Sequence, residues 1–117
     1  MRPPLVENIM KTPVYMTDEE KTAEEAIREM ESKGVKKILV TRQGNPIGVL
    51  ERWKITEMDK ALPIKNLKLS PYQVVPLGTE IASIESYLRD YTAVYVSEPK
   101  SQKIVGVVTA YDLVAAY

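Results

Sequence analysis

The chain has 117 residues, of which 44% are apolar and 27% charged, and its 16 basic and 16 acidic residues give zero net charge. This size and balance are typical of one compact globular domain, and the lack of a basic excess argues against a nucleic-acid partner. With no Cys and no His, the sequence excludes disulfides, a conventional zinc site, and Ser-His or Cys-His nucleophilic catalysis.

No run of the sequence approaches the roughly 18 apolar residues that a membrane span requires. The opening Met1-Arg2-Pro3-Pro4 lacks the apolar core of a signal peptide, so we expect a cytoplasmic protein without a membrane partner. Zero net charge gives little colloidal repulsion and is compatible with self-association. The absence of Phe and Cys beside abundant Glu, Lys, Val and Ile favours a thermophilic source.

The first elements form a strand and a capped helix. A helical or turn-like lead over Val6–Met10 precedes a strand expected over Val14–Met16. A helix is expected after Thr22, because Thr22 as N-cap and Glu25 three residues later form a capping-box pattern, and Gly34 is placed as the C-cap. The residues that recur at i, i+3, i+4 and i+7 along one face of this helix are Ala23, Ala26, Ile27 and Met30.

A hairpin and a short helix complete the first half. The strands are expected over Lys37–Thr41 and Pro46–Leu50, and Gln43-Gly44-Asn45 joins them. In this join the Gly and the Asn favour the positive φ angles that a tight hairpin needs. A short helix is expected over Arg52–Lys60, and Leu62-Pro63 is the linker. So short a linker predicts two halves that pack tightly together.

The second half is predicted to follow the same order. Its expected elements are a strand over Gln73–Pro76, a helix capped by Thr79 that carries Ile81, Ile84 and Leu88, a hairpin of Thr92–Ser97 and Lys103–Val108 across Glu98–Ser101, and a last helix over Ala110–Ala116.

The two halves align with each other at an offset of 58 residues. The aligned segments are Val6–Ile9 with Ile64–Leu67, Lys11–Pro13 with Leu69–Pro71, and Gly48–Leu50 with Gly106–Val108. A repeat at one fixed period indicates two supersecondary units, each burying the apolar face of the other. We therefore expect an α+β fold of two β-α-β-β-α repeats, residues 1–63 and 64–117, packed with pseudo-twofold symmetry around two equivalent clefts.

The most specific local string is Gly106–Asp112, read as a buried strand that ends in Thr109 at a helix start, with Asp112 three residues on. Backbone N–H groups at such a point favour an anion such as phosphate, and a carboxylate can accept hydrogen bonds from the vicinal hydroxyls of a ribose. The structural alternative is that Thr109 caps the helix and Asp112 complements its dipole. The residues alone leave both interpretations open.

The doubled order, closed by Gly-φ-φ-Thr/Ser-x-x-Asp, resembles a pair of cystathionine β-synthase (CBS) domains, the Bateman module. The resemblance covers about residues 6–117, and Asn8–Pro13 is similar to the φ-M-x-x-P/T opening of that family. It implies a stand-alone regulatory or sensor module, not an enzyme, whose ligand is AMP, ADP, ATP or S-adenosylmethionine. No covalent cofactor, catalytic residue or metal is implied.

Ligand binding in the family implies an inter-repeat cleft built from the Thr/Asp end of one repeat and the opening segment and second strand of the other. The residues carried over by position are Thr12, Pro13, Val14, Val35, Lys36, Lys37, Thr109 and Asp112. Thr12 and the Val14 backbone are placed to meet the base, and Val35 to flank the adenine. Lys36 or Lys37 is a candidate for phosphate, with a solvent-facing position on the strand as the equal alternative.

The equivalent positions of the first repeat depart from this pattern, because Glu51 stands for Thr109 and Lys54 for Asp112. Glu51 brings a negative charge to the phosphate position, and Lys54 cannot accept from ribose hydroxyls. We therefore expect one adenosine site per chain and a degenerate second cleft, in which Glu51 and Lys54 form a local ion pair at i, i+3.

Two function classes remain in view. The first is the adenosine sensor, expected as a homodimer that acts on an effector protein the sequence does not identify. The second is a structural or protein-interaction module whose nucleotide site is vestigial. Trp53, Tyr72, Tyr91 and Tyr111 are expected to serve packing or interfaces more often than base stacking. The choice among AMP, ADP, ATP and S-adenosylmethionine is not encoded in any motif.

Overall fold

The computed structural model describes residues 2–117, which separate into two compact units. Unit 1 joins the first lead-in, up to Val14, to Pro71–Tyr117, and unit 2 is Tyr15–Ser70. The first lead-in, residues 2–14, thus groups with the sheet of the second repeat, and the second lead-in, residues 64–70, groups with the sheet of the first. The repeats 1–63 and 64–117 predicted from the sequence describe the duplication, and the compact units follow a different division of the chain.

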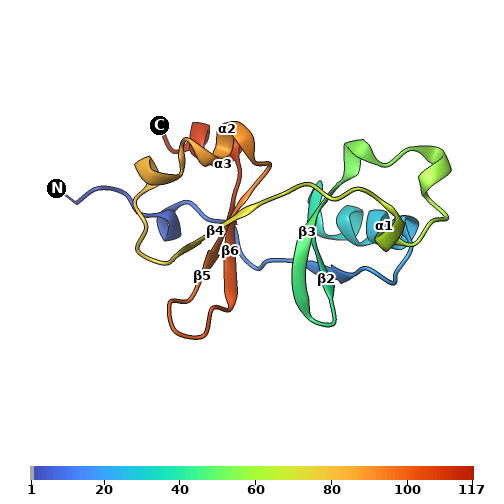
Figure 1. Ribbon diagram of the computed structural model, residues 1–117. Helices are drawn as coiled ribbons and strands as arrows, with labels where there is room; N and C mark the ends of the chain where they lie inside the picture. Colours follow the sequence, from blue (N-terminus) through green and yellow to red (C-terminus); the bar gives the residue numbers. More distant parts are fainter. Residues whose placement is uncertain (1) are drawn as a thin grey trace. The chain divides into compact units, whose positions relative to one another are not determined.

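Unit 2 contains a three-stranded sheet in the order β1-β2-β3, with α1 beside it (Figure 1). β1 pairs with β2 in parallel across the α1 connection, and β2 pairs with β3 as an antiparallel hairpin. The elements of this unit are β1 (Met16–Asp18), α1 (Ala23–Lys33), β2 (Lys37–Arg42), β3 (Asn45–Glu51) and the 3₁₀ turns η2 (Arg52–Lys54), η3 (Glu57–Asp59) and η4 (Ile64–Asn66).

Unit 1 repeats this plan with a sheet in the order β4-β5-β6, again parallel and then antiparallel (Figure 1). Its elements are η1 (Val6–Asn8), β4 (Gln73–Pro76), η5 (Ile81–Ile84), α2 (Tyr87–Asp90), β5 (Val94–Ser97), β6 (Ile104–Val108) and α3 (Ala110–Ala115). The mixed α+β class and the doubled order of elements predicted from the sequence are confirmed.

The predicted caps of α1 are present. The Glu25 backbone N–H donates to Thr22 Oγ1, and the Thr22 backbone N–H donates to Glu25 Oε1, both at 3.1 Å. This reciprocal pair satisfies two donors that a helix start leaves without intrahelical partners. Gly34 ends the helix at φ 67°, a left-handed conformation that glycine adopts without a Cβ clash.

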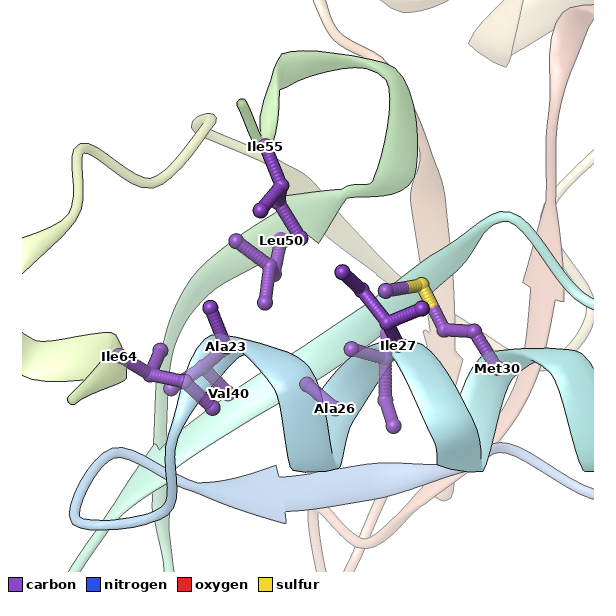
Figure 2. Packing of buried hydrophobic residues seen from close by; sticks show 9 residues of the cluster. Ala23, Ala26, Ile27, Met30, Val40, Leu50, Ile55 and Ile64 are labelled. Atoms are coloured by element: carbon purple, nitrogen blue, oxygen red, sulfur yellow. The ribbon is translucent and has the colours of Figure 1, made fainter. Parts of the chain in front are cut away.

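The predicted apolar stripe of α1 forms the core of unit 2. Figure 2 shows its side chains facing those of the β2–β3 hairpin and of the segments that follow. The buried members of the cluster are Ala23, Ala26, Ile27, Met30, Ile38, Val40, Leu50, Ile55 and Ile64. Truncating a buried Ile or Met in such a core costs about 2–5 kcal/mol, so this cluster supplies a large part of the stability of the unit.

Several predicted boundaries are wrong in detail. The first strand begins at Met16 instead of Val14, because its parallel pairing with β2 starts at Met16 opposite Leu39. The helix predicted over Arg52–Lys60 is two 3₁₀ turns, since Ile55 and Thr56 between them adopt extended backbone.

The second helical segment and the first hairpin turn also differ from expectation. Thr79 caps no helix: its hydroxyl donates to the Pro76 carbonyl at 2.7 Å, and the segment after it divides into η5 and α2. In the β2–β3 turn the positive φ angles fall on Gln43 and Gly44, not on Asn45. The pairing of Arg42 with Asn45 moves the two-residue turn one position toward the N-terminus.

Each lead-in makes a two-way backbone bridge to the last strand of its unit. In unit 1 the Lys11 N–H donates to the Val107 carbonyl at 2.8 Å and the Val107 N–H donates back at 3.1 Å. In unit 2 Ser70 and Val49 exchange the same two bonds, at 2.8 and 2.9 Å. Lys11 is therefore equivalent to Ser70, one position away from the partner Leu69 that the 58-residue offset indicated.

Glycine allows this close approach in both units. A Cβ on Gly48 lies 2.6 Å from Leu69 Cβ, and a Cβ on Gly106 lies 2.8 Å from Met10 Cγ and closer still to its sulfur. The two crowded neighbours differ in kind. Leu69 Cβ is fixed to the backbone, whereas the Met10 thioether is the flexible end of a side chain.

We predict that Gly48→Ala lowers the free energy of unfolding by about 1–3 kcal/mol and that Leu69→Ala does not relieve the loss, because the clashing Leu69 Cβ is still present. Gly106→Ala is also destabilising, but Met10→Ala relieves it, since the clashing atoms are removed. Urea denaturation of the four single and two double variants gives the two coupling energies. Equal coupling in the two pairs contradicts the prediction.

Candidate functional site

Thr109 and Asp112 meet where β6 passes into α3. The Asp112 carboxylate is nearly buried, with 4% of the side chain exposed. Its Oδ2 accepts from the Thr109 backbone N–H at 2.9 Å and from the Thr109 hydroxyl at 3.1 Å. The capping alternative raised by the sequence is therefore realised in this geometry. The Thr109 backbone N–H, at the start of the six-residue α3, is therefore already bonded within the chain.

The other carboxylate oxygen faces a lysine that the sequence analysis did not single out. Lys11 Nζ lies 3.3 Å from Asp112 Oδ1, and the lysine side chain is 65% exposed. The same ammonium lies 5.1 Å from the ring centroid of Tyr111, within the range of a cation–π contact. The buried anion at the start of α3 is therefore neutralised from outside, by a cation on the lead-in.

The remaining predicted residues are divided between the two units. Thr12, Pro13 and Val14 follow Lys11 in the same unit as Asp112; Thr12 and Pro13 are exposed and joined by a cis peptide bond, and Val14 is half-buried.

Val35, Lys36 and Lys37 belong to unit 2. Val35 packs against the α1 cluster, and the Lys36 carbonyl accepts from the Arg52 N–H at 2.9 Å. The ligand-binding roles expected for these three residues stay predictions.

The equivalent position in unit 2 holds the predicted ion pair. Lys54 Nζ lies 3.1 Å from Glu51 Oε2, and the Ser70 hydroxyl donates to the same oxygen at 2.7 Å. Lys54 also donates to Ser70 Oγ at 2.8 Å, and the Trp53 indole N–H donates to Glu51 Oε1 at 3.3 Å. This arrangement replaces the hydroxyl and carboxylate of unit 1 by a carboxylate and an ammonium.

The two units share one feature, a contact between the lead-in and the buried carboxylate. In each unit the lead-in residue of the backbone bridge, Lys11 or Ser70, contacts the buried carboxylate at the end of the sheet. Sequence reasoning missed both residues because the second lead-in is one residue longer than the first. Aligning Met10 with Leu69, as the side chains that cover Gly106 and Gly48, would have found them.

The tyrosines noted in the sequence make ring contacts within unit 1. Tyr72 meets Tyr95 edge-on at 5.4 Å, and Tyr91 meets Tyr87 edge-on at 6.3 Å. Burial raises the pKa of Tyr95 far above its ordinary value and raises the pKa of Tyr72 less. Packing therefore accounts for Tyr72 and Tyr91, while Tyr111 stays largely exposed beside Lys11.

Comparison with known proteins gives a consistent result. Residues 6–60 match the CBS domain family model. Sequence comparison with curated proteins finds no match. Among solved structures, a CBS domain protein of unknown function from Thermoplasma acidophilum is 21% identical, with a TM-score of 0.79 over 99% of this chain and 70% of that one.

Two further structures have the same fold. An uncharacterised conserved protein from Pyrococcus horikoshii is 18% identical, with a TM-score of 0.80 over 97% of this chain and 92% of that one. A protein from Methanocaldococcus jannaschii is 18% identical with a TM-score of 0.75; the chain is covered over 96% of its length and spans 58% of that protein.

The family match identifies a CBS domain over the first repeat, and the duplication at a fixed period together with the fold of both units supports a tandem CBS pair. CBS domains are in general regulatory modules and not catalysts. Within residues 2–117, no helix is long and apolar enough to cross a membrane.

We predict that Asp112→Asn lowers the free energy of unfolding by about 0.5–1 kcal/mol, because it removes the attraction to the exposed Lys11 but keeps an oxygen that accepts from Thr109. Asp112→Ala is expected to cost about 1 kcal/mol more, since the cap is lost as well. Thermal and urea unfolding measure both values. Equal losses for the two variants would show that the cap contributes nothing.

Proposed function

We propose that this CBS pair is a regulatory module that binds an adenosine-containing ligand, with Asp112 as the acceptor for its ribose hydroxyls. The single observation that carries the proposal is the Asp112 carboxylate itself, oriented by two Thr109 hydrogen bonds at Oδ2 and paired at Oδ1 with the exposed Lys11. Neighbouring carboxylate oxygens can accept from both hydroxyls of a vicinal diol.

The surroundings of Asp112 support this choice. The carboxylate is nearly buried, and hydrogen bonds to an ionised acceptor are strengthened where water is excluded. Thr12–Val14, the candidates for contact with the base, belong to the same unit and follow the residue that meets Asp112. In unit 2 the equivalent position carries Lys54, an ammonium without acceptor capacity, which supports one adenosine site per chain.

A regulatory role requires more than binding. A ligand shifts a conformational equilibrium only when its affinity differs between the two states. Asp112 contacts the lead-in through Lys11, and the lead-in is held to β6 by its backbone. Ligand occupancy at Asp112 therefore changes the restraints on a segment that an effector protein can recognise.

A structural or protein-interaction module is the second candidate, and one observation favours it. Both oxygens of Asp112 already have partners within the chain, and among residues 2–117 no buried side-chain N or O atom lacks one. A site whose polar groups are all satisfied can serve stability alone.

We predict that calorimetric titration with AMP, ADP, ATP and S-adenosylmethionine shows about one binding site per chain for at least one of them. Asp112→Asn is expected to weaken that binding at least tenfold, because each lost charge-assisted hydrogen bond contributes about 1.5–3 kcal/mol. The matched control is Lys54→Ala at the equivalent position of unit 2, which is expected to leave the affinity unchanged.

If none of the four ligands binds to the folded protein, the result favours the structural module. Two equivalent sites per chain would contradict the assignment of the unit 2 position as degenerate.

We propose further that the chain forms a homodimer through α3. Tyr111, Val114 and Tyr117 recur at i, i+3 and i+6 and are 74, 74 and 77% exposed. Tyr111 and Val114 are one turn apart on α3 and Tyr117 follows the helix, and we refer to these three residues as the exposed apolar stripe. Large exposed apolar side chains grouped in this way mark an interaction surface, and the zero net charge gives little repulsion between copies.

We predict that Val114→Lys shifts the protein from dimer to monomer without loss of folding, because a lysine at the centre of the stripe must be desolvated in the dimer. Light scattering coupled to gel filtration measures the mass. Met58→Lys, which changes an 88% exposed apolar residue of unit 2, is the control and is expected to leave the dimer intact. A wild-type mass that is monomeric at every concentration refutes the homodimer.

A further inference from the structure

The backbone of the lead-in fixes the position of the Lys11 Cα, but it does not fix the position of the Lys11 ammonium. Both backbone groups of Lys11 are bonded to Val107, and Met10 before it covers Gly106. The ammonium, in contrast, is on a flexible stem that is 65% exposed, between Asp112 Oδ1 and the Tyr111 ring. Lys11 can therefore leave Asp112 without any movement of the backbone.

A ribose that binds Asp112 must displace the Lys11 ammonium from Asp112 Oδ1. The hydroxyls that replace the ammonium are neutral, so the lysine loses its anionic partner when the ligand arrives. A ligand that carries an anion close to its ribose restores a partner to Lys11, and a ligand that carries a cation there repels it. The net charge beside the ribose thus decides whether displacement of Lys11 favours or opposes binding.

We infer that Lys11 is a selectivity residue of the Asp112 site, favouring adenosine ligands with phosphate on the ribose over adenosine and over the sulfonium ligand S-adenosylmethionine. This inference rests on the proposed adenosine-binding function and extends it by naming the ligand class. The three ligands share the same adenine and ribose, and they differ in the charge carried at the 5′ position: anionic in AMP, neutral in adenosine, and cationic at the sulfur of S-adenosylmethionine.

Unit 2 shows that the fold does not require a cation at this position. Ser70 occupies the equivalent place, makes the same backbone bridge, and donates to Glu51. In that unit the cation comes from Lys54, on the turn itself. Lys11→Ser therefore installs a residue that the chain already uses at the equivalent site, which makes it a substitution compatible with folding.

The test is calorimetric titration of the full chain with AMP, adenosine and S-adenosylmethionine, for the wild type, Lys11→Ser and Lys11→Arg. Lys11→Ser is expected to weaken AMP binding about three- to tenfold while leaving adenosine binding unchanged or tighter and S-adenosylmethionine binding tighter. The preference for AMP over adenosine therefore falls at least threefold. Lys11→Arg keeps the charge and is expected to keep most of the preference.

Two controls separate the outcomes. Lys100→Ser removes the same charge from the β5–β6 turn, at the opposite end of the hairpin from α3, and is expected to leave the preference unchanged. Raising the salt concentration is expected to reduce the wild-type preference for AMP toward that of Lys11→Ser.

Binding of these ligands with a preference that Lys11→Ser leaves unchanged overturns the inference alone, since the adenosine site then stands without a role for Lys11. Absence of binding by all three ligands to the folded wild type overturns the proposed function and this inference together.

Discussion

The backbone bridge between each lead-in and the last strand of its sheet is the constraint on which the rest of this structure depends. Lys11 with Val107 and Ser70 with Val49 each exchange two hydrogen bonds, and a glycine in each last strand leaves room for the neighbouring Met10 or Leu69. The bridge joins residues 11 and 107 in unit 1 and residues 49 and 70 in unit 2. It also determines which lead-in side chain faces the end of the sheet, where the buried carboxylate of each unit lies.

The ends of the two sheets show that the same scaffold can place a carboxylate and a lysine at different positions. In unit 1 the carboxylate is Asp112, four residues after the last residue of β6, and the cation is Lys11 of the lead-in. In unit 2 the carboxylate is Glu51, at the strand end itself, and the cation Lys54 is on the same turn. Each buried anion has a partially exposed lysine as its counterion. In each place, hydrogen bonds within the chain and a nearby ammonium together offset the cost of burying the carboxylate.

A partner that stabilises the free protein is also a competitor for any ligand of the same group. Lys11 offsets the charge of Asp112, and under the proposed function a ribose at Asp112 would displace it. The stability and the affinity of this site are therefore coupled through one exposed lysine. Because that lysine is 65% exposed, the coupling is modest in energy and sensitive to salt. Such coupling suits a module that responds to changes in ligand concentration.

The sequence by itself determined the features that depend on local chemistry. The duplication, the α1 caps at Thr22 and Gly34, the apolar stripe and the Glu51–Lys54 pair were all predicted from spacing, because capping, helical periodicity and i, i+3 contacts involve neighbours along the chain. The resemblance implied that the first lead-in lies near the end of the second sheet, but tertiary structure alone decided that Lys11 is the residue that contacts Asp112. This contact joins residues 11 and 112, and a one-residue difference between the lead-ins changes which side chain faces the carboxylate. An alignment at one fixed offset is wrong after such an insertion. The close approach of the lead-ins to Gly48 and Gly106 determines which lead-in residue pairs with which strand residue.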